Sequence, residues 1–296
     1  MTLNEARTVL TKELNNLYDS DELKNIVGLI IEHITNMPRM EQVKNKATFL
    51  TCTQLESLDT ITERLKKNEP VQYVLGEAWF AGMKFKVNKN VLIPRPETEE
   101  LVDWIIKEAM SHELRAASIL DVGTGSGCIP ITLKKKLPQT TITAIDVCSE
   151  ALFTATENAI ELNTEVNFIL LDFLDEEKWN ELEQYDIIVS NPPYVKQSEK
   201  ETMHERIITF EPHKALFVPD NDALIFYEKL CDFSLTHLKP GGSIFVEINE
   251  SLGQDVMNLF QGKGFTSVEI KKDLQEKDRM VKASKDNGIQ LRLNDK

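Results

Sequence analysis

Residues 1 to about 68 place their apolar positions three and four apart, which is the period of an amphipathic helix. The stretch SDELKNIVGLIIEHITN shows this spacing from Leu23 to Ile34, and TQLESLDTITERLKK repeats it from Leu55 to Leu65. Neither stretch contains a glycine-rich loop or a cluster of carboxylates. The pattern predicts a small all-α domain over residues 1–68 that serves packing or holds a partner, and not catalysis.

The pattern changes over residues 69–96, where apolar positions alternate with polar ones around turn residues such as Gly82. Alternation of this kind is typical of strands, so we expect a β-hairpin over about 71–93 within a linker of residues 69–96. Pro96 suits the first turn of the helix that follows. Three aromatic residues are expected to pack this linker and not to bind substrate: Trp79, Phe80 and Phe85.

From residue 97 to residue 296, apolar runs of strand length alternate with helical segments. The strands are expected at 118–122, 141–145, 166–171, 185–190, 243–248, 266–271 and 279–283. The helices are expected at 97–111, 128–136, 149–162, 222–238 and 251–262. This order predicts an α/β domain with a seven-stranded, largely parallel sheet that helices cover on both faces. Ligands of such sheets bind at the carboxyl ends of the strands.

Composition limits the class of function. The chain of 296 residues is 28% charged and 41% apolar, which is typical of a soluble enzyme of about two domains. Its net charge of −14 argues against a protein held on nucleic acid by phosphate contacts. The four cysteines show no CxxC spacing and the histidines are dispersed, so no metal site is expected. Without a signal peptide or an apolar run of 18 residues, we expect a cytoplasmic protein that makes no membrane contact.

The stretch ILDVGTGSGCIPI has the form of a strand, a glycine loop and a helix. Gly123, Gly125 and Gly127 allow a tight turn and a close approach of a ligand to the backbone of Thr124 and Ser126. The spacing is tighter than that of a dinucleotide loop. A plain turn without a ligand is the alternative at this point.

Acidic residues at the next two strand ends strengthen the ligand interpretation. Asp146 follows the loop by about 20 residues, where an acid can bridge two ribose hydroxyls. Asp172 and Phe173 end the next strand and could contact an adenine amine and its ring face. Each acid alone could be a helix cap, but together they favour a nucleoside site. Asp121, ahead of the loop, suits the cationic S-adenosylmethionine better than a pyrophosphate, and a nicotinamide-dependent oxidoreductase would lack evident hydride-transfer partners.

The stretch YDIIVSNPPYV presents Asn191, Pro192, Pro193 and Tyr194 at the end of the fourth strand. The prolines fix the backbone, so the Asn191 side-chain oxygen and the Pro192 carbonyl can each accept one hydrogen of a planar NH2 group. Such acceptors would favour a tetrahedral nitrogen whose lone pair faces a methyl donor, while Tyr194 stacks on the substrate. A structural turn or cis-proline is the alternative.

The chain resembles the HemK/PrmC family of glutamine methyltransferases along almost its whole length. The stretches that carry the resemblance are QYVLGEAWFAGMKFKV, VLIPRPETEELV, LDVGTGSG, IVSNPPYV, EPHKALF, GGSIFVEI and KDLQEKDRMV. It departs from the family at Pro130, at Asn249 and in FVPDNDAL, and the tail KDNGIQLRLNDK has no counterpart in the family. The resemblance implies a Rossmann-like methyltransferase domain over 97–296, after the helical domain and the hairpin linker.

The same resemblance implies methyl transfer from S-adenosylmethionine to the glutamine of the Gly-Gly-Gln motif in peptide-chain release factors, which act in translation termination. It assigns Gly123 to Gly127, Asp146 and the pair Asp172 and Phe173 to the cofactor, and Asn191 to Tyr194 to the glutamine amide. The implied partner is a protein, held by the helical domain of a monomeric enzyme. Two other functions stay open: an adenine-amine methyltransferase acting on nucleic acid, and an idle cofactor-binding module.

Three further residues have open roles. Arg95 either contacts the cofactor region or the substrate, or forms an ion pair with Glu97 or Glu99. Glu211 belongs to a mobile lid or to an exposed loop. Glu247 lines the pocket or caps a turn.

Overall fold

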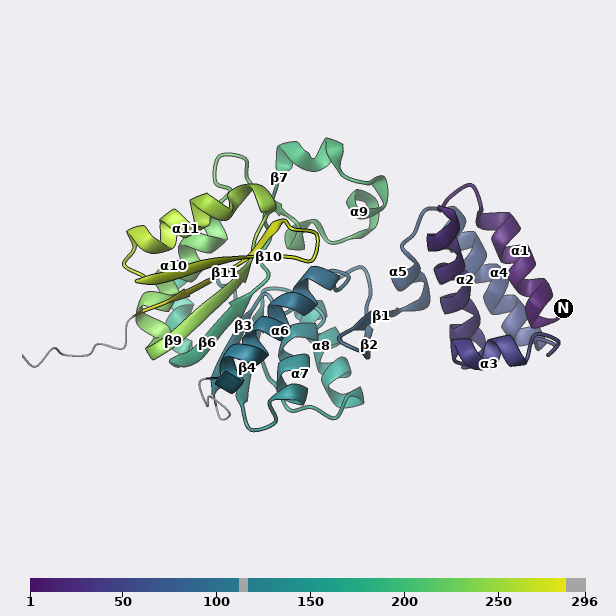
Figure 1. Ribbon diagram of the computed structural model, residues 1–296, viewed down its shortest axis with the longest axis horizontal. Coiled ribbons are helices and arrows are strands. Elements are labelled where there is room, and N and C mark those ends of the chain that lie inside the picture. The colour runs from purple at the N-terminus through teal and green to yellow at the C-terminus, as the bar shows by residue number, and fades with distance from the viewer. Residues whose placement is uncertain (112–116, 286–296) are drawn as a thin grey trace, which may run out of the picture. The chain divides into compact units, whose positions relative to one another are not determined.

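The computed structural model of the chain describes residues 1–111 and 117–285 (Figure 1). Residues 112–116 and 286–296 of the expected methyltransferase domain, with nearly all of the tail, lie outside the described residues. The chain divides into two compact units. Unit 1 comprises Met1–Glu77 and His204–Phe210, and unit 2 comprises Ala78–Met203 and Glu211–Lys296.

Unit 1 is helical. Its helices are α1 (Leu3–Leu14), α2 (Ser20–Thr35), α3 (Arg39–Lys44), α4 (Cys52–Lys66), α5 (Val71–Leu75) and α9 (Glu205–Phe210). The apolar faces of α1, α2, α4 and α5 meet in one buried core. The segment that carries α9 joins this unit through Arg206, whose guanidinium lies 4.4 Å from the Tyr18 ring and donates to Asn68 Oδ1 at 3.1 Å.

The hairpin is shorter than the expected range of 71–93. Residues 71–75 form helix α5, because Val71, Val74 and Leu75 have helical spacing and pack into the core of unit 1. Gly76 ends this helix with φ of 71°, a conformation that glycine adopts without strain. The hairpin itself consists of β1 (Glu77–Phe80) and β2 (Met83–Lys86).

Unit 2 contains the expected seven-stranded sheet. Its strands are β3 (Ser118–Val122), β4 (Thr141–Asp146), β5 (Asn167–Leu170), β6 (Tyr185–Ser190), β9 (Leu238–Glu247), β10 (Ser267–Lys272) and β11 (Asp278–Ser284). The strand order is β10-β11-β9-β6-β3-β4-β5, and β11 runs in the opposite direction to the other six strands. A short second pair joins β7 (Val195–Lys196) to β8 (Phe217–Val218).

Helices cover both faces of the sheet (Figure 1). One face packs against α6 (Pro96–Ser111), α7 (Cys128–Lys136) and α8 (Ser149–Glu161). The other face packs against α10 (Ile225–His237) and α11 (Gly253–Gly262). Short 3-10 helices complete the unit: η1 (Glu176–Glu181), η2 (Gln197–Thr202), η3 (His213–Ala215) and η4 (Glu250–Leu252).

The aromatic residues of the hairpin divide into two groups. Phe80 and Phe85 are fully buried and meet edge to face with ring centroids 6.0 Å apart, as expected for packing residues. Trp79 differs from the expectation, because it is half exposed beneath the Lys84 ammonium.

Candidate active site

The glycine loop and the NPPY stretch follow neighbouring strands. Val122, the last residue of β3, pairs with Ser190, the last residue of β6, and the Ser190 hydroxyl donates to the Val122 carbonyl at 2.8 Å. The chain passes from β3 to β4 and β5 on one side and returns to β6 on the other, so the two loops lie at the topological switch point of the sheet. Ligands of open α/β sheets bind at this position.

The glycine loop is held by the strand end beside it. The backbone N–H groups of Gly123 and Thr124 donate to the Ile145 carbonyl at 2.9 and 3.0 Å, and the Gly125 N–H donates to Asp146 Oδ2 at 2.8 Å. A Cβ placed on Gly123 or Gly125 would meet no atom within 4 Å. The space beside these two residues is therefore open to a ligand.

Gly127 has a different role, because it joins the loop to helix α7. Its φ is 77°, and a Cβ at this position would lie 3.0 Å from Ile131 Cδ1 and 3.1 Å from Ala155 Cβ. A side chain here would be strained by both the backbone and the packing of α7 against α8.

We therefore expect Gly127→Ala to lower the free energy of unfolding by about 2–4 kcal/mol, and Gly125→Ala by only about 1–2 kcal/mol. Urea unfolding followed by tryptophan fluorescence measures this, since Trp79, Trp104 and Trp179 all lie in unit 2. Equal losses in the two variants would contradict the packing argument.

Asp121 lies beneath the glycine loop with 0% exposure, and neither of its carboxylate oxygens has a hydrogen-bond partner among the described residues. The hydroxyls of Thr124 and Ser126 are likewise buried and unpartnered within the described part of the chain. Burial raises the pKa of Asp121 to about 7. The Thr124 hydroxyl is close enough to act against the rise, although the two groups do not meet the geometry of a hydrogen bond, and the charge of Asp146 adds to the rise. Unpartnered acceptors of this kind fit a cationic group. S-adenosylmethionine has two such groups, a sulfonium and an ammonium.

The acids of the next strand ends occupy the expected edge of the sheet. Asp146 accepts from the Gly125 and Cys148 N–H groups, and burial raises its pKa. Asp172 Oδ1 accepts from the Leu174 N–H at 3.0 Å, and the side chain is partly exposed. The Phe173 ring, 5% exposed, packs against Trp179 and Phe233 in the core and does not lie open at the strand ends.

Asn191 is the first residue after β6, and its side chain is oriented by helix α6. The Asn191 Nδ2 group donates to Thr98 Oγ1 at 3.0 Å, and the Thr98 hydroxyl donates to Glu247 Oε2 at 2.6 Å. Pro192 is buried, whereas Asn191, Pro193 and Tyr194 are partly exposed. No peptide bond within residues 1–111 and 117–285 is cis.

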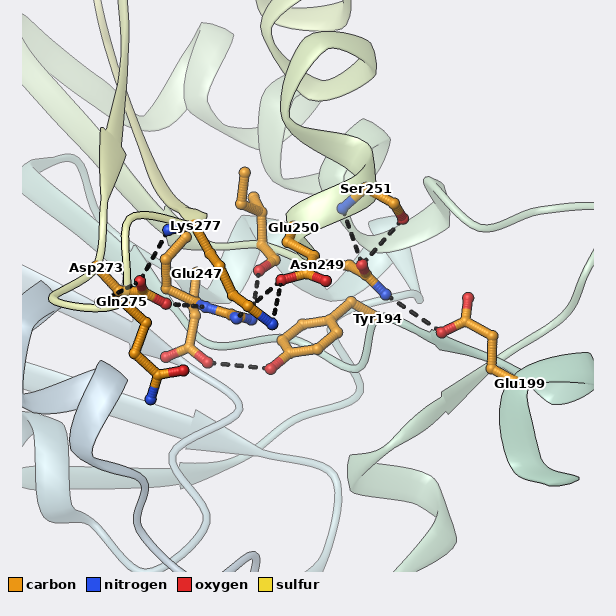
Figure 2. A network of polar contacts seen from close by, with 11 residues as sticks. Tyr194, Glu199, Glu247, Asn249, Glu250, Ser251, Asp273, Gln275 and Lys277 are labelled. Carbon is orange, nitrogen blue, oxygen red and sulfur yellow. Dashed lines mark hydrogen bonds and ion pairs between the residues drawn. The ribbon is translucent and has the colours of Figure 1, made fainter. Parts of the chain in front are cut away.

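Tyr194 meets the same carboxylate from the other side. Its hydroxyl donates to Glu247 Oε1 at 3.1 Å. Figure 2 shows the ring pointing at this carboxylate. Burial and the nearby Glu247 raise the pKa of Tyr194 well above its ordinary range, so this hydroxyl remains a donor. Glu247 is 1% exposed, and burial raises its pKa while the Thr98 and Tyr194 hydroxyls act against the rise. Its carboxylate is bound to the Thr98 and Tyr194 hydroxyls beside Asn191.

Glu211 links two further motif stretches. It is 4% exposed, forms an ion pair with Arg95 at 2.5 Å and accepts from the Ile93 N–H at 3.4 Å. Of the two open alternatives for Arg95, the structure shows an ion pair, but its partner is Glu211 and not Glu97 or Glu99. Glu211 is also no exposed loop residue; it follows α9 and ties EPHKAL to IPRPE.

We expect Glu211→Gln to lower the free energy of unfolding by about 1–3 kcal/mol, because it leaves Arg95 without its charged partner. The matched control is Glu161→Gln, which alters the more exposed pair with Lys86 and should leave the unfolding midpoint unchanged. Tryptophan fluorescence in urea again measures both variants. A Glu211→Gln midpoint equal to that of the control would contradict a structural role for this pair.

Sequence reasoning missed Thr98 as a site residue. It lies in the first turn of α6 inside RPETEE, where its neighbours are charged and it resembles an ordinary helix-start residue. The departure Asn249 has a local role: it accepts from Ser251 at the start of η4 and donates to Glu199 (Figure 2).

Among the described residues, no group of three or more His, Cys, Asp or Glu side chains is placed to hold a metal ion. In the same part of the chain, no helix has the length and apolar character needed to cross a bilayer.

The chain is similar to known proteins in both of its parts. Residues 5–76 match the family model of the PrmC N-terminal domain, and residues 103–216 match that of the methyltransferase small domain. A solved structure, the Thermus thermophilus 16S rRNA N2 G1207 methyltransferase in complex with AdoMet and guanosine, superposes with a TM-score of 0.51 at 17% identity. The alignment covers 71% of this chain and 49% of that one, and it shows a common fold.

Two curated relatives match nearly end to end. The release factor glutamine methyltransferase of Flavobacterium psychrophilum is 41% identical, over 96% of this chain and 99% of the relative. That of Bacteroides thetaiotaomicron is 39% identical, over 96% of this chain and 100% of the relative. The chain belongs to the release factor glutamine methyltransferase family.

Proposed function

We propose that this protein transfers a methyl group from S-adenosylmethionine to the side-chain amide nitrogen of the Gly-Gly-Gln glutamine in peptide-chain release factors. The observation that carries the proposal is the juxtaposition of the glycine loop after β3 with Asn191 after β6. A methyl-donor site and an amide-binding site at neighbouring strand ends suit direct transfer between the two ligands. The names of the relatives specify the release factor as the substrate.

The cofactor half of the site consists of the loop and the acids around it. Asp121 with Thr124 and Ser126 offers unpartnered acceptors to a cationic group, and the open space at Gly123 and Gly125 admits it. Further residues proposed to hold the cofactor lie at the adjacent strand ends: Gly127, Asp146, Asp172, Phe173 and Asn191. Phe173 would contribute through its backbone, because its ring is packed in the core.

The substrate half is the NPPY stretch. Asn191 donates with Nδ2 to Thr98, which leaves Oδ1 as an acceptor for one hydrogen of the substrate NH2 group. The Pro192 carbonyl would accept the other hydrogen, Pro193 holds the turn, and Tyr194 would lie against the flat amide. Two acceptors off the amide plane favour a pyramidal nitrogen, which has the lone pair that a planar amide lacks.

The bound cofactor supplies an electrophilic methyl group on a sulfonium. The protein orients the amide and supplies fixed dipoles. No protein group has to remove a proton from the amide before the methyl group is transferred. The nitrogen becomes acidic only after it has been methylated, and it would then lose its proton to solvent, with S-adenosylhomocysteine as the other product.

We propose further that the enzyme is a cytoplasmic monomer that acts on protein without direct nucleic-acid contact. The net charge of −14 disfavours binding to nucleic acid through its phosphates. The four cysteines, all within the described residues, form no disulfide, which suits a reducing compartment. Light scattering of the purified enzyme gives its molar mass and so tests whether it is a monomer.

Labelled methyl transfer tests the activity. The enzyme is incubated with labelled S-adenosylmethionine and a release factor, with the same factor carrying a changed motif glutamine, or with duplex DNA. Label on the unaltered factor alone supports the proposal. Label on DNA, or equal label on both factors, would contradict it.

A further inference from the structure

The Thr98 hydroxyl decides which way the Asn191 amide faces. A hydroxyl has one proton, and Thr98 donates it to Glu247 Oε2 at 2.6 Å. Its oxygen can then only accept, so the Asn191 group at 3.0 Å must be Nδ2. The amide oxygen Oδ1 is thereby turned away from Thr98. If the Asn191 amide were flipped, its oxygen would face the Thr98 oxygen, which is also an acceptor. Its NH2 group would then face the NH2 group of the substrate.

Glu247 is fixed well enough to control this chain of hydrogen bonds. It is the last residue of β9 and pairs with Met280 of β11. Its carbonyl accepts from the Tyr227 hydroxyl at 3.0 Å. Both carboxylate oxygens accept hydroxyl donors: Oε2 accepts from Thr98. Oε1 accepts from Tyr194, the contact drawn in Figure 2. The ionised carboxylate offers acceptors only, which sets the direction of both bonds, and the two hydroxyl donors act against the rise in its pKa that burial causes.

The same carboxylate therefore holds both functional side chains of the NPPY stretch. Asn191 is oriented through Thr98, and Tyr194 is bound directly. Thr98 is 3% exposed and Glu247 1% exposed, so water does not compete for these bonds. The contacts join helix α6, the end of β6 and the end of β9.

From this geometry we propose that Thr98 and Glu247 are positioning residues, which hold the Asn191 amide with its oxygen toward the substrate. The inference rests on the proposed amide methylation and deepens it. Neither residue needs to touch the glutamine. Their effect is on the fraction of Asn191 side chains that present an acceptor, and hence on kcat more than on binding.

The test compares Thr98→Val with Thr98→Ser. Valine has nearly the same shape but no hydroxyl, whereas serine keeps the hydroxyl and loses a methyl group. We expect Thr98→Val to lower kcat for release-factor methylation by about tenfold or more, with KM for the factor and Kd for S-adenosylmethionine within about threefold. Thr98→Ser should keep kcat within about threefold of the unaltered enzyme.

Three results would overturn the inference. One is a Thr98→Val kcat within threefold of the unaltered enzyme. Another is a Thr98→Ser variant as slow as Thr98→Val, which would assign the effect to packing of the methyl group. The third is loss of cofactor binding in Thr98→Val in parallel with kcat, which would mean a general disruption. If the unaltered enzyme itself transfers no methyl, the proposed function fails and the inference falls with it.

Discussion

Asn191→Ala is expected to lower kcat for methyl transfer to a release factor by about 10²–10³-fold, because it removes one of the two acceptors that hold the substrate NH2 group. The other polar atom of the Asn191 amide, Nδ2, donates to Thr98 Oγ1 at 3.0 Å. The amide oxygen Oδ1 therefore points in a defined direction in the folded protein. A pre-oriented acceptor acts mainly in the transition state, where the nitrogen becomes pyramidal. Single-turnover transfer of labelled methyl under saturating cofactor measures the loss.

The control for this variant is Asn180→Ala, at an exposed asparagine of η1. It should leave kcat unchanged. The Kd of Asn191→Ala for S-adenosylmethionine should change by less than tenfold, since the loop and the acids remain. A kcat for Asn191→Ala within threefold of the unaltered enzyme would rule out the acceptor role and would leave NPPY as a structural turn.

Asp121→Asn is expected to weaken S-adenosylmethionine binding by about 100-fold, because it removes the charge that faces a cationic ligand. The pKa of Asp121 is about 7, raised by burial, so the carboxyl is largely protonated at pH 6.0. A cation binds the ionised form, and the unaltered protein should therefore bind about eightfold more tightly at pH 7.5 than at pH 6.0. The Asn variant should lose this pH dependence. Isothermal titration at the two pH values measures both effects.

Ionisation of Asp121 strengthens cofactor binding in this proposal, but it should lower the free energy of unfolding of the ligand-free protein. The unfolded pKa of an aspartate is about 3.9 and the folded pKa of Asp121 is about 7, so the folded protein holds the extra proton between these values. Its contribution to stability is fully present below pH 4 and is lost as pH rises through 7, by about 4 kcal/mol in total.

Asp121→Asn should consequently flatten the fall in unfolding free energy of the ligand-free protein between pH 5 and pH 8. Urea unfolding at several pH values, followed by tryptophan fluorescence, measures the slope. A variant that binds the cofactor as tightly as the unaltered protein would contradict the role of Asp121 in binding. An unchanged slope would instead contradict the burial argument.

The sequence alone predicted the fold class and most elements. Helical period in the first part and strand–helix alternation in the second are local patterns, and α7 lies at the expected Cys128–Lys136. It also placed the glycine loop and NPPY at strand ends, because glycine and proline restrict the backbone wherever they occur. Residues 71–75 were expected in the hairpin but form a helix, since one turn of helical spacing identifies a helix only together with the core into which it packs.

Tertiary structure alone decided which distant residues meet. The bond from Asn191 to Thr98 spans 93 positions and the bond from Thr98 to Glu247 spans 149, and no local pattern encodes such pairings. The partner of Arg95 depended in the same way on the return of the chain after α9. Hydrogen-bond direction and burial arise from neighbours that strand order brings together. The sequence therefore determined which groups the chain offers to a substrate, and the fold determined how they are oriented.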